Sequence, residues 1–127
     1  MELQEIQDRN KEIALMLNWK EEQLGSWFHI QNNVNYVVYS EHNNYPHKGL
    51  PFHRDWNWLM EAVEFIEKSN KYKVIIGPND WCTIKTQFLH IKRDFVDVID
   101  VCSSTTKKEA IFLAVSDFAK KFNNNKL

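Results

Sequence analysis

Apolar residues recur at helical spacing in three parts of the chain. Residues 3–18, 54–69 and 106–122 each carry apolar side chains three or four positions apart, which predicts three amphipathic helices. The last of these begins with a Thr and a Glu three positions apart, a capping box in which each side chain binds a free backbone N–H group of the first turn. The first helix has an alternative start, because Asp8 or Asn10 could cap a shorter helix.

Residues that favour β-structure fill the stretches between these helices. Two such runs flank a polar turn and predict a hairpin, and three more, separated by turn residues, predict a meander. The predicted fold class is therefore α+β, with an antiparallel sheet (hairpin plus three-stranded meander) packed with three helices in the order α-ββ-α-βββ-α. The predicted strands cover residues 27–30, 34–39, 72–76, 81–91 and 95–101.

Two segments are polar and rich in turn-forming residues. Residues 20–25 end in Gly and are expected to stop the first helix, and residues 41–51 are expected to form an irregular loop. No linker or repeat interrupts the chain. With 127 residues it is long enough to bury a core of its own, so residues 1–127 are predicted to be a single domain.

The predicted second helix has apolar residues on two faces. Trp58 and Phe65 lie one helical repeat apart on a face that is otherwise charged. Large aromatic side chains on such a face need a cover, either from the chain itself or from a partner, and this makes them candidate binding residues. The other face is expected to pack in the core through Trp56, Leu59, Met60, Val63 and Ile66.

Composition and charge change this picture mainly by exclusion. Apolar residues make up 43% of the chain and aromatic residues 13%, which suits a packed core, and the net charge of −1 supplies no basic field for nucleic acid. No apolar run is long enough to cross a membrane. The polar, acidic start does not resemble a signal peptide, so we expect a cytoplasmic protein. Cys82 and Cys102 are then expected to be reduced, buried thiols and not nucleophiles.

Histidines just before the second helix resemble a set of metal ligands. His42, His47 and His53 lie close to Asp55 in the sequence, but they are five and six positions apart, unlike the short-spaced pairs of zinc sites. We therefore predict no bound metal and no cofactor. The sequence also contains no nucleophile motif and no glycine-rich phosphate loop.

The stretch Leu50 to Glu67, LPFHRDWNWLMEAVEFIE, carries a resemblance. It resembles a segment, roughly H-S-D-W-N-W-L-M-x-V-V-E-K-I-E, of a family of small phage and prophage proteins of Bacteroidota-type genomes. The whole arrangement is similar to the phage αβα-sandwich domain. Arg54 departs from the family's usual Ser, which is the better helix cap. The resemblance implies a phage-derived accessory protein and carries over no activity.

Two functions fit these observations. The first is a non-enzymatic phage or mobile-element accessory protein that binds a protein partner or forms a weak homodimer. The alternative is a small ligand-binding protein or enzyme with a pocket between loop 41–53 and the second helix. Neither a nucleic-acid partner nor a membrane is expected, and no catalytic residue is assigned. The candidate binding residues are His47, His53, Asp55, Trp56, Asn57, Trp58 and Phe65.

Overall fold

The computed structural model describes residues 1–23, 26–31, 34–40, 50–78, 80–86, 97–101 and 106–127. Within these ranges, helices and strands alternate in blocks along the chain. The elements, in chain order, are α1 (Leu3–Met16), β1 (Trp19–Gln23), β2 (Ser26–Gln31), β3 (Val34–Ser40), α2 (Trp56–Lys68), β4 (Tyr72–Ile76), β5 (Cys82–Thr86), β6 (Asp97–Val101) and α3 (Lys107–Asn123).

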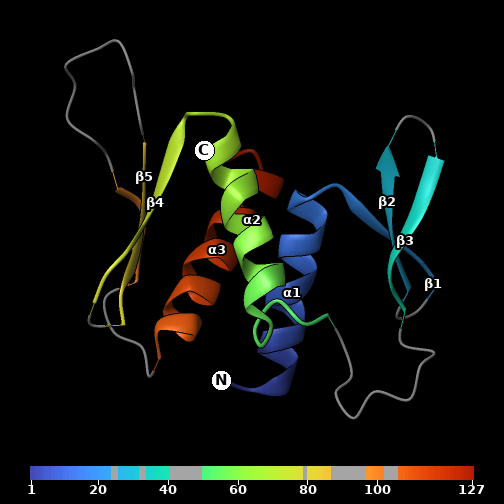
Figure 1. The fold of residues 1–127 in the computed structure, drawn as a ribbon, viewed down its shortest axis with the longest axis horizontal. Helices are drawn as coiled ribbons and strands as arrows, with labels where there is room; N and C mark the ends of the chain where they lie inside the picture. The colour runs from blue at the N-terminus through green and yellow to red at the C-terminus, as the bar shows by residue number, and fades with distance from the viewer. Residues whose placement is uncertain (24–25, 32–33, 41–49, 79, 87–96, 102–105) are drawn as a thin grey trace.

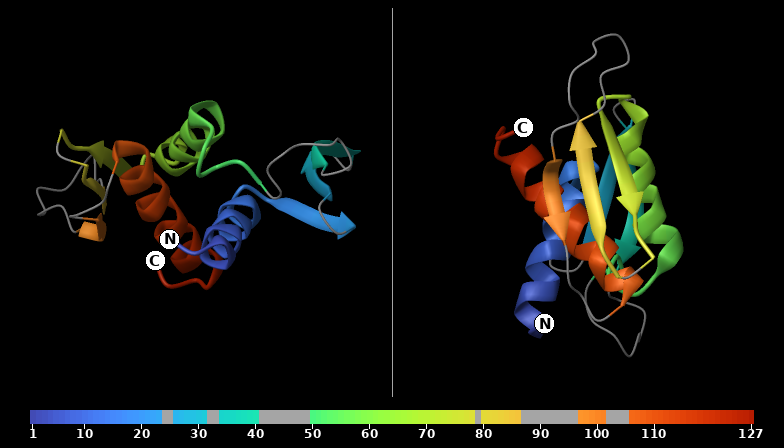
Figure 2. Two further views of the ribbon diagram at one scale, coloured as in Figure 1. Left: turned by 90° about the horizontal axis from the view of Figure 1, so that it is seen from below. Right: turned by 90° about the vertical axis from the view of Figure 1, so that its left-hand side faces the viewer.

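The three helices lie together in the middle of the molecule, with one β-sheet on either side (Figure 1). Strands β4, β5 and β6 form an antiparallel sheet that packs against α3 and, through β4, against α2. Strands β1, β2 and β3 form a second antiparallel sheet, which joins the helices through the packing of β1 against α1. Figure 2 shows that this second sheet extends away from the helices, beyond α1.

The predicted α+β class and the order of the helices, hairpin and meander are confirmed. Two features differ from the prediction: the hairpin and the meander belong to separate sheets, and β1 precedes the hairpin. Strand β1 occupies residues that were expected to end the first helix. Its residues are largely charged, and it lies at the edge of its sheet, where charged side chains are common because one side of the strand faces solvent.

Each helix ends next to an asparagine in the left-handed backbone region. Asn18, Asn70 and Asn125 have φ angles of 65°, 59° and 54°, and each follows directly on a helix C-cap residue. Asparagine tolerates this conformation better than other residues with a side chain, apart from glycine, so it can reverse the chain direction after a helix. At Asn18 this reversal makes Trp19 the first residue of β1.

Helix α3 is the centre of the core. Its predicted start is confirmed, because the Thr106 side chain accepts a hydrogen bond from the Glu109 N–H at 3.1 Å. α1 begins at Leu3, so the alternative of a shorter first helix is wrong, and Asn10 is a buried residue inside the helix. The buried residues of α3 cover more than half of its circumference, whereas Lys107, Lys120 and Lys121 are exposed. The buried residues are Ala110, Ile111, Phe112, Ala114, Val115, Ser116, Phe118 and Ala119.

Polar contacts tie α1 to α3 along their shared side. The Arg9 guanidinium donates to Ser116 Oγ at 2.8 Å and to Asp117 Oδ1 at 2.7 Å. Further along both helices, Asn123 Nδ2 donates to the Glu12 backbone oxygen at 2.9 Å. Contacts that advance in the same order along both helices mean that α1 and α3 run in the same general direction.

Cys82 on β5 is fully buried, as expected, whereas Cys102 lies outside the described residues. Burial raises the pKa of the Cys82 thiol from 9.0 to about 12 because the thiolate loses its hydration. The thiolate is the nucleophilic form, so Cys82 is poorly suited to covalent chemistry in the folded protein.

We predict that Cys82 resists alkylation in the native protein. The pKa rise from 9.0 to about 12 makes its thiolate about a thousandfold scarcer at neutral pH than that of an ordinary thiol. In a Cys102→Ser variant only Cys82 can react, and iodoacetamide should modify the folded protein at least about a hundredfold more slowly than the urea-unfolded one. Equal rates in the two states would contradict the buried position of Cys82.

The turn between β4 and β5 has no room for a side chain at position 77. The Gly77 N–H donates to the Trp81 backbone oxygen at 2.9 Å, which closes the turn, and Gly77 is itself buried. A Cβ atom at this position would overlap the Trp81 indole ring. The Gly77 backbone is outside the left-handed region, so the requirement for glycine here is steric and not conformational.

We therefore expect Gly77→Ala to destabilise the protein by about 1–3 kcal/mol, the usual cost of forcing extra atoms into a packed site. The free energy of unfolding in urea measures this effect. In a Trp81→Ala background the same substitution should cost much less, because the overlapping ring is gone. An equal cost in both backgrounds would show that the indole ring is not the reason for the glycine.

Candidate functional site

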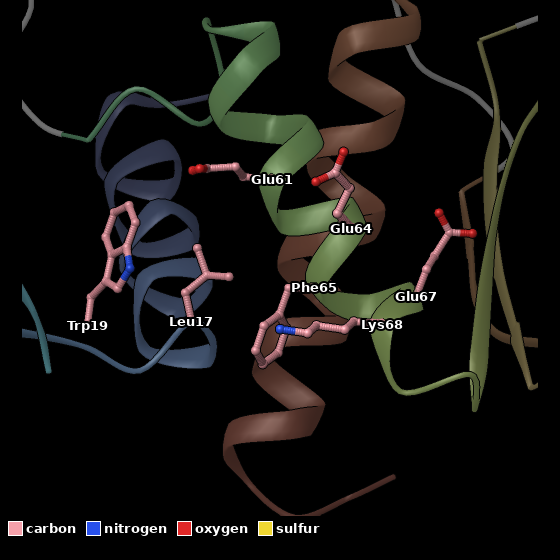
Figure 3. A pocket seen from close by; sticks show the side chains of 7 residues that line it. All are labelled: Leu17, Trp19, Glu61, Glu64, Phe65, Glu67 and Lys68. Atoms are coloured by element: carbon pink, nitrogen blue, oxygen red, sulfur yellow. The ribbon is translucent and has the colours of Figure 1, made fainter. Parts of the chain in front are cut away.

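A groove of about 810 Å³ runs between the C-terminal end of α1 and the outer side of α2. Figure 3 shows its two walls, with Leu17 and Trp19 on one side and the side chains of α2 on the other. It is an open groove and not an enclosed cavity. The residues that line it are Leu17, Trp19, Glu61, Glu64, Phe65, Glu67 and Lys68.

The groove exists because α1 and α2 both pack against α3, whereas they make few direct contacts with each other. When two helices pack against a third, a gap forms between them wherever their axes diverge. Side chains fill such a gap only in part. Leu17, the C-cap of α1, and Trp19, the first residue of β1, form one wall of this gap. Phe65 of α2 is partly buried and faces the gap from the other wall.

The core-facing side of α2 differs from the prediction. Trp56 is 42% exposed, so its predicted place in the core is wrong, while the buried residues of the helix are Leu59, Ala62, Val63 and Ile66. Trp58 and Phe65 lie beside this buried stripe and not opposite it, and both pack against the core while keeping part of their surface exposed. The buried stripe is centred nearer to these two aromatic residues than the sequence suggested, because Ala62 belongs to it and Trp56 does not.

Trp58 is held by two other aromatic rings. Its ring centroid lies 5.4 Å from that of Trp19 and 5.5 Å from that of Phe52, both in edge-on geometry. Edge-on aromatic pairs are favourable beyond the area that they bury. Trp58 is thus covered by the chain itself, and it fixes Trp19 in the wall of the groove.

Carboxylates form the rim of the groove. Glu61 and Glu64 are exposed, and neither makes a hydrogen bond or an ion pair with any described residue. In Figure 3 the Glu61 side chain extends from α2 towards the wall formed by α1. Glu67 points the other way, and its Oε2 accepts from the Val74 N–H at 3.4 Å. Lys68 is the positively charged residue among those that line the groove.

The polar residues predicted to line a ligand pocket have structural contacts. His53 Nδ1 lies 2.9 Å from the Nδ2 of Asn10, a residue that is 2% exposed, and its ring lies against Phe112. The Oδ1 of Asn10 is buried and has no hydrogen-bond partner among the described residues. The Asp55 carboxylate caps α2 by accepting from the N–H groups of Asn57 and Trp58, at 2.9 and 3.3 Å. His47 lies outside the described residues.

Trp56 and Asn57 are exposed at the N-terminal end of α2, away from the groove. The Lys108 ammonium lies 5.3 Å from the centre of the Trp56 ring and also donates to the Arg54 backbone oxygen at 3.1 Å. Within the described part of the chain, the buried Arg54 Nη1 atom has no hydrogen-bond partner. The predicted binding residues of α2 therefore fall in two places. Phe65 lines the groove and Trp58 packs behind it, whereas Trp56 and Asn57 lie at the other end of the helix.

A second, smaller cavity of about 230 Å³ adjoins the groove on the other side of Phe65. Its walls are mainly aromatic, and the Phe65 ring lies 6.0 Å from that of Phe122 in edge-on geometry. Phe122 itself is 43% exposed. Phe65 thus stands between two hollows and belongs to both.

Among the described residues, no group of three His, Cys, Asp or Glu side chains could hold a metal ion. His42 and His47 lie outside the described residues. The structure therefore places only His53 of the three histidines that resemble metal ligands in the sequence. No helix in the described part of the chain is long and apolar enough to span a membrane.

Comparisons with known proteins add no constraint on this site. No protein-family model matches the chain, and no match was found among curated proteins or among solved structures. The geometry of the groove is therefore the basis for any functional conclusion.

Sequence reasoning identified Phe65 but missed the opposite wall of the groove. The predicted first helix covers residues 3–18, with Leu17 in its last turn, and no role is predicted for Trp19, because the reversal of the chain at Asn18 was not anticipated. An Asn between a helical pattern and a large aromatic residue was the available signal, since Asn often occupies the left-handed position that ends a helix.

We predict different costs for truncating two neighbouring tryptophans of α2. Trp58→Ala should destabilise the protein by about 3 kcal/mol, because it removes a ring held between Trp19 and Phe52. Trp56→Ala should cost at most about 1 kcal/mol, because the residue is 42% exposed and its ring has a cation–π contact with Lys108. Urea unfolding of both variants measures the difference. Similar costs for the two would refute this assignment of buried and exposed rings.

Proposed function

We propose that this protein acts by binding a protein partner through the groove between α1 and α2, and not by catalytic turnover. Its role as a phage or mobile-element accessory protein is part of the same proposal and rests on the sequence resemblance alone. Its place in the cytoplasm is also part of the proposal and comes from the sequence pattern, not from that resemblance. The observation that carries the proposal is the apolar lining of the groove, with Leu17 and Trp19 in one wall and Phe65 in the other.

This apolar lining supports the proposal because it combines rigidity with accessible apolar surface. Trp19 is only 8% exposed and gives rigid backing, whereas Leu17 and Phe65 are partly buried and leave apolar surface open to the groove. Trp19 is held by ring contacts with Trp58 and Phe52, and Phe65 by a ring contact with Phe122. Preformed aromatic surface lowers the entropy cost of association, and aromatic residues in a depression are typical anchors for a partner's side chains. The exposed carboxylates of Glu61 and Glu64 border this apolar lining, which matches the usual arrangement of an interface, with an apolar centre and a polar rim.

The alternative function, a ligand pocket between loop 41–53 and α2, has less support. Residues 41–49 of that loop lie outside the description. Of the described residues assigned to the pocket, Asp55 is engaged in capping α2, and Trp58 in aromatic packing. His53 is paired with a buried Asn10. Each of these contacts serves the fold, so we prefer the groove.

A matched pair of variants tests the proposal. Phe65→Ala removes an aromatic residue from the groove, and Trp56→Ala removes an exposed one at the other end of the same helix. In affinity purification from the native host, the wild type and Trp56→Ala should recover the same partner protein. Phe65→Ala should bind it about thirtyfold more weakly or worse, the effect of losing an interface anchor worth about 2 kcal/mol.

One control and two contrary outcomes make this result decisive. A circular dichroism melt must show that Phe65→Ala is folded at the temperature of the purification. Equal recovery by Phe65→Ala and the wild type would contradict binding through the groove. Saturable turnover of a small substrate that is abolished by His53→Ala or Asp55→Ala would instead favour the alternative function.

A further inference from the structure

We infer that the groove recognises a cationic amphipathic segment, in which lysine or arginine side chains alternate with apolar ones. This inference rests on the proposed function and adds the chemistry of the partner. Four features of the groove support it: its carboxylates, the helix end beside it, its aromatic lining, and the cost of leaving its charges unpaired.

The carboxylates give the groove more negative charge than the rest of the chain would suggest. Three glutamates and one lysine line it, Glu61, Glu64, Glu67 and Lys68, which leaves a formal charge of −2, whereas the whole chain carries only −1. Glu67 is turned towards β4, so Glu61 and Glu64 are the carboxylates available to a partner. Neither forms an ion pair with a described residue, although Lys68, one helical turn after Glu64, lines the same groove.

The end of α1 adds to the negative potential. A helix carries a partial negative charge at its C-terminus, where the last backbone carbonyl groups lack partners within the helix. α1 has no basic residue in its last turn, and its C-cap, Leu17, is part of the groove wall. The partial charge of this helix end is therefore not neutralised by a side chain of its own, and it favours a cation in the groove.

The aromatic residues that line the groove suit the same kind of ligand. Ammonium and guanidinium groups are attracted to the faces of aromatic rings, and their aliphatic stems pack well on apolar surfaces. This chain already contains one such contact, with the Lys108 ammonium over the Trp56 ring. A partner's Lys or Arg can place its stem on Phe65 or Leu17, since Trp19 is only 8% exposed, and its charge near Glu61 or Glu64.

Other occupants fit these features less well. A phosphate group or an acidic peptide would meet like charges at the rim. A purely apolar segment would cover the Glu61 and Glu64 carboxylates without pairing them, and desolvating an unpaired charge is costly. The groove therefore favours positive charge and apolar surface in the same segment.

Defined peptides test the inference directly. The probes are three helical peptides of equal length in which leucines alternate at helical spacing with lysine, glutamine or glutamate. Titration calorimetry measures their binding to the wild type, to Glu61→Gln/Glu64→Gln and to Phe65→Ala. A fourth protein, Glu2→Gln/Asp8→Asn, is the control, because it has the same change in net charge on two exposed residues, the N-cap of α1 and a residue in the first half of that helix.

We expect the leucine–lysine peptide to bind the wild type and the control equally. Its affinity for Glu61→Gln/Glu64→Gln should fall at least about tenfold and depend less on salt, because an interaction between charges is screened by ions. The glutamate peptide should bind the wild type at least about tenfold more weakly than the lysine peptide. A dissociation constant unchanged by Glu61→Gln/Glu64→Gln would overturn the inference.

The other outcomes separate this inference from the proposed function. If the glutamine peptide binds as tightly as the lysine peptide and Phe65→Ala weakens both, the groove is a docking site without a preference for charge, and only the inference fails. If Phe65→Ala weakens no peptide that binds, docking in the groove fails as well. If none of the peptides binds, the inference is overturned, and the recovery of a partner from the host still tests the proposed function.

Discussion

The burial of α3 between α1 and the β4–β6 sheet is the constraint on which the rest of the structure depends. The alanines at positions 110, 114 and 119 are fully buried, and small side chains allow neighbouring elements to approach closely. Larger side chains such as Phe112 and Phe118 fill the remaining space. The Arg9 contacts with Ser116 and Asp117 then set the alignment of α1 along α3.

This constraint also explains the groove. α2 packs against α3 and β4, and α1 packs against α3 and β1, so each of the two helices is fixed without requiring extensive contact with the other. Apolar residues at the ends of these helices, Leu17 on one and Phe65 on the other, therefore remain at the edge of the core and not inside it. The same packing that buries α3 leaves an apolar surface facing a gap, and the acidic side of α2 borders that surface.

Much of the fold could be predicted from local patterns. The capping box at Thr106 placed the start of α3 correctly because a cap is determined by residues within one turn. Strand β1 was missed because it is polar and is held by backbone pairing with β2, including the pair Lys20 and Phe28, and not by an apolar pattern of its own. The orientation of α2 was misjudged because apolar residues cover most of its circumference, and only tertiary contacts decide which of them are buried.

The candidate site was less predictable than the fold. Phe65 stood out in the sequence as an aromatic residue among charges, but the groove also needs Trp19, which is about 45 residues away in the chain and is placed by the reversal at Asn18. Trp56 illustrates the opposite error. The apolar pattern of the second helix predicted that it is buried, but it is 42% exposed. A site formed by a gap between two helices depends on distances that no local pattern encodes.

The central claim is that the wall formed by α1 and β1 and the wall formed by α2 act together as one binding surface. Mapping of backbone amide chemical shifts by NMR, during titration with the leucine–lysine peptide, tests this most directly. The account predicts shifts concentrated at residues 15–20 and 60–69, with little change in β4–β6 away from α2. Shifts confined to the exposed N-terminal end of α2 around Trp56, or spread evenly over the molecule, would contradict it.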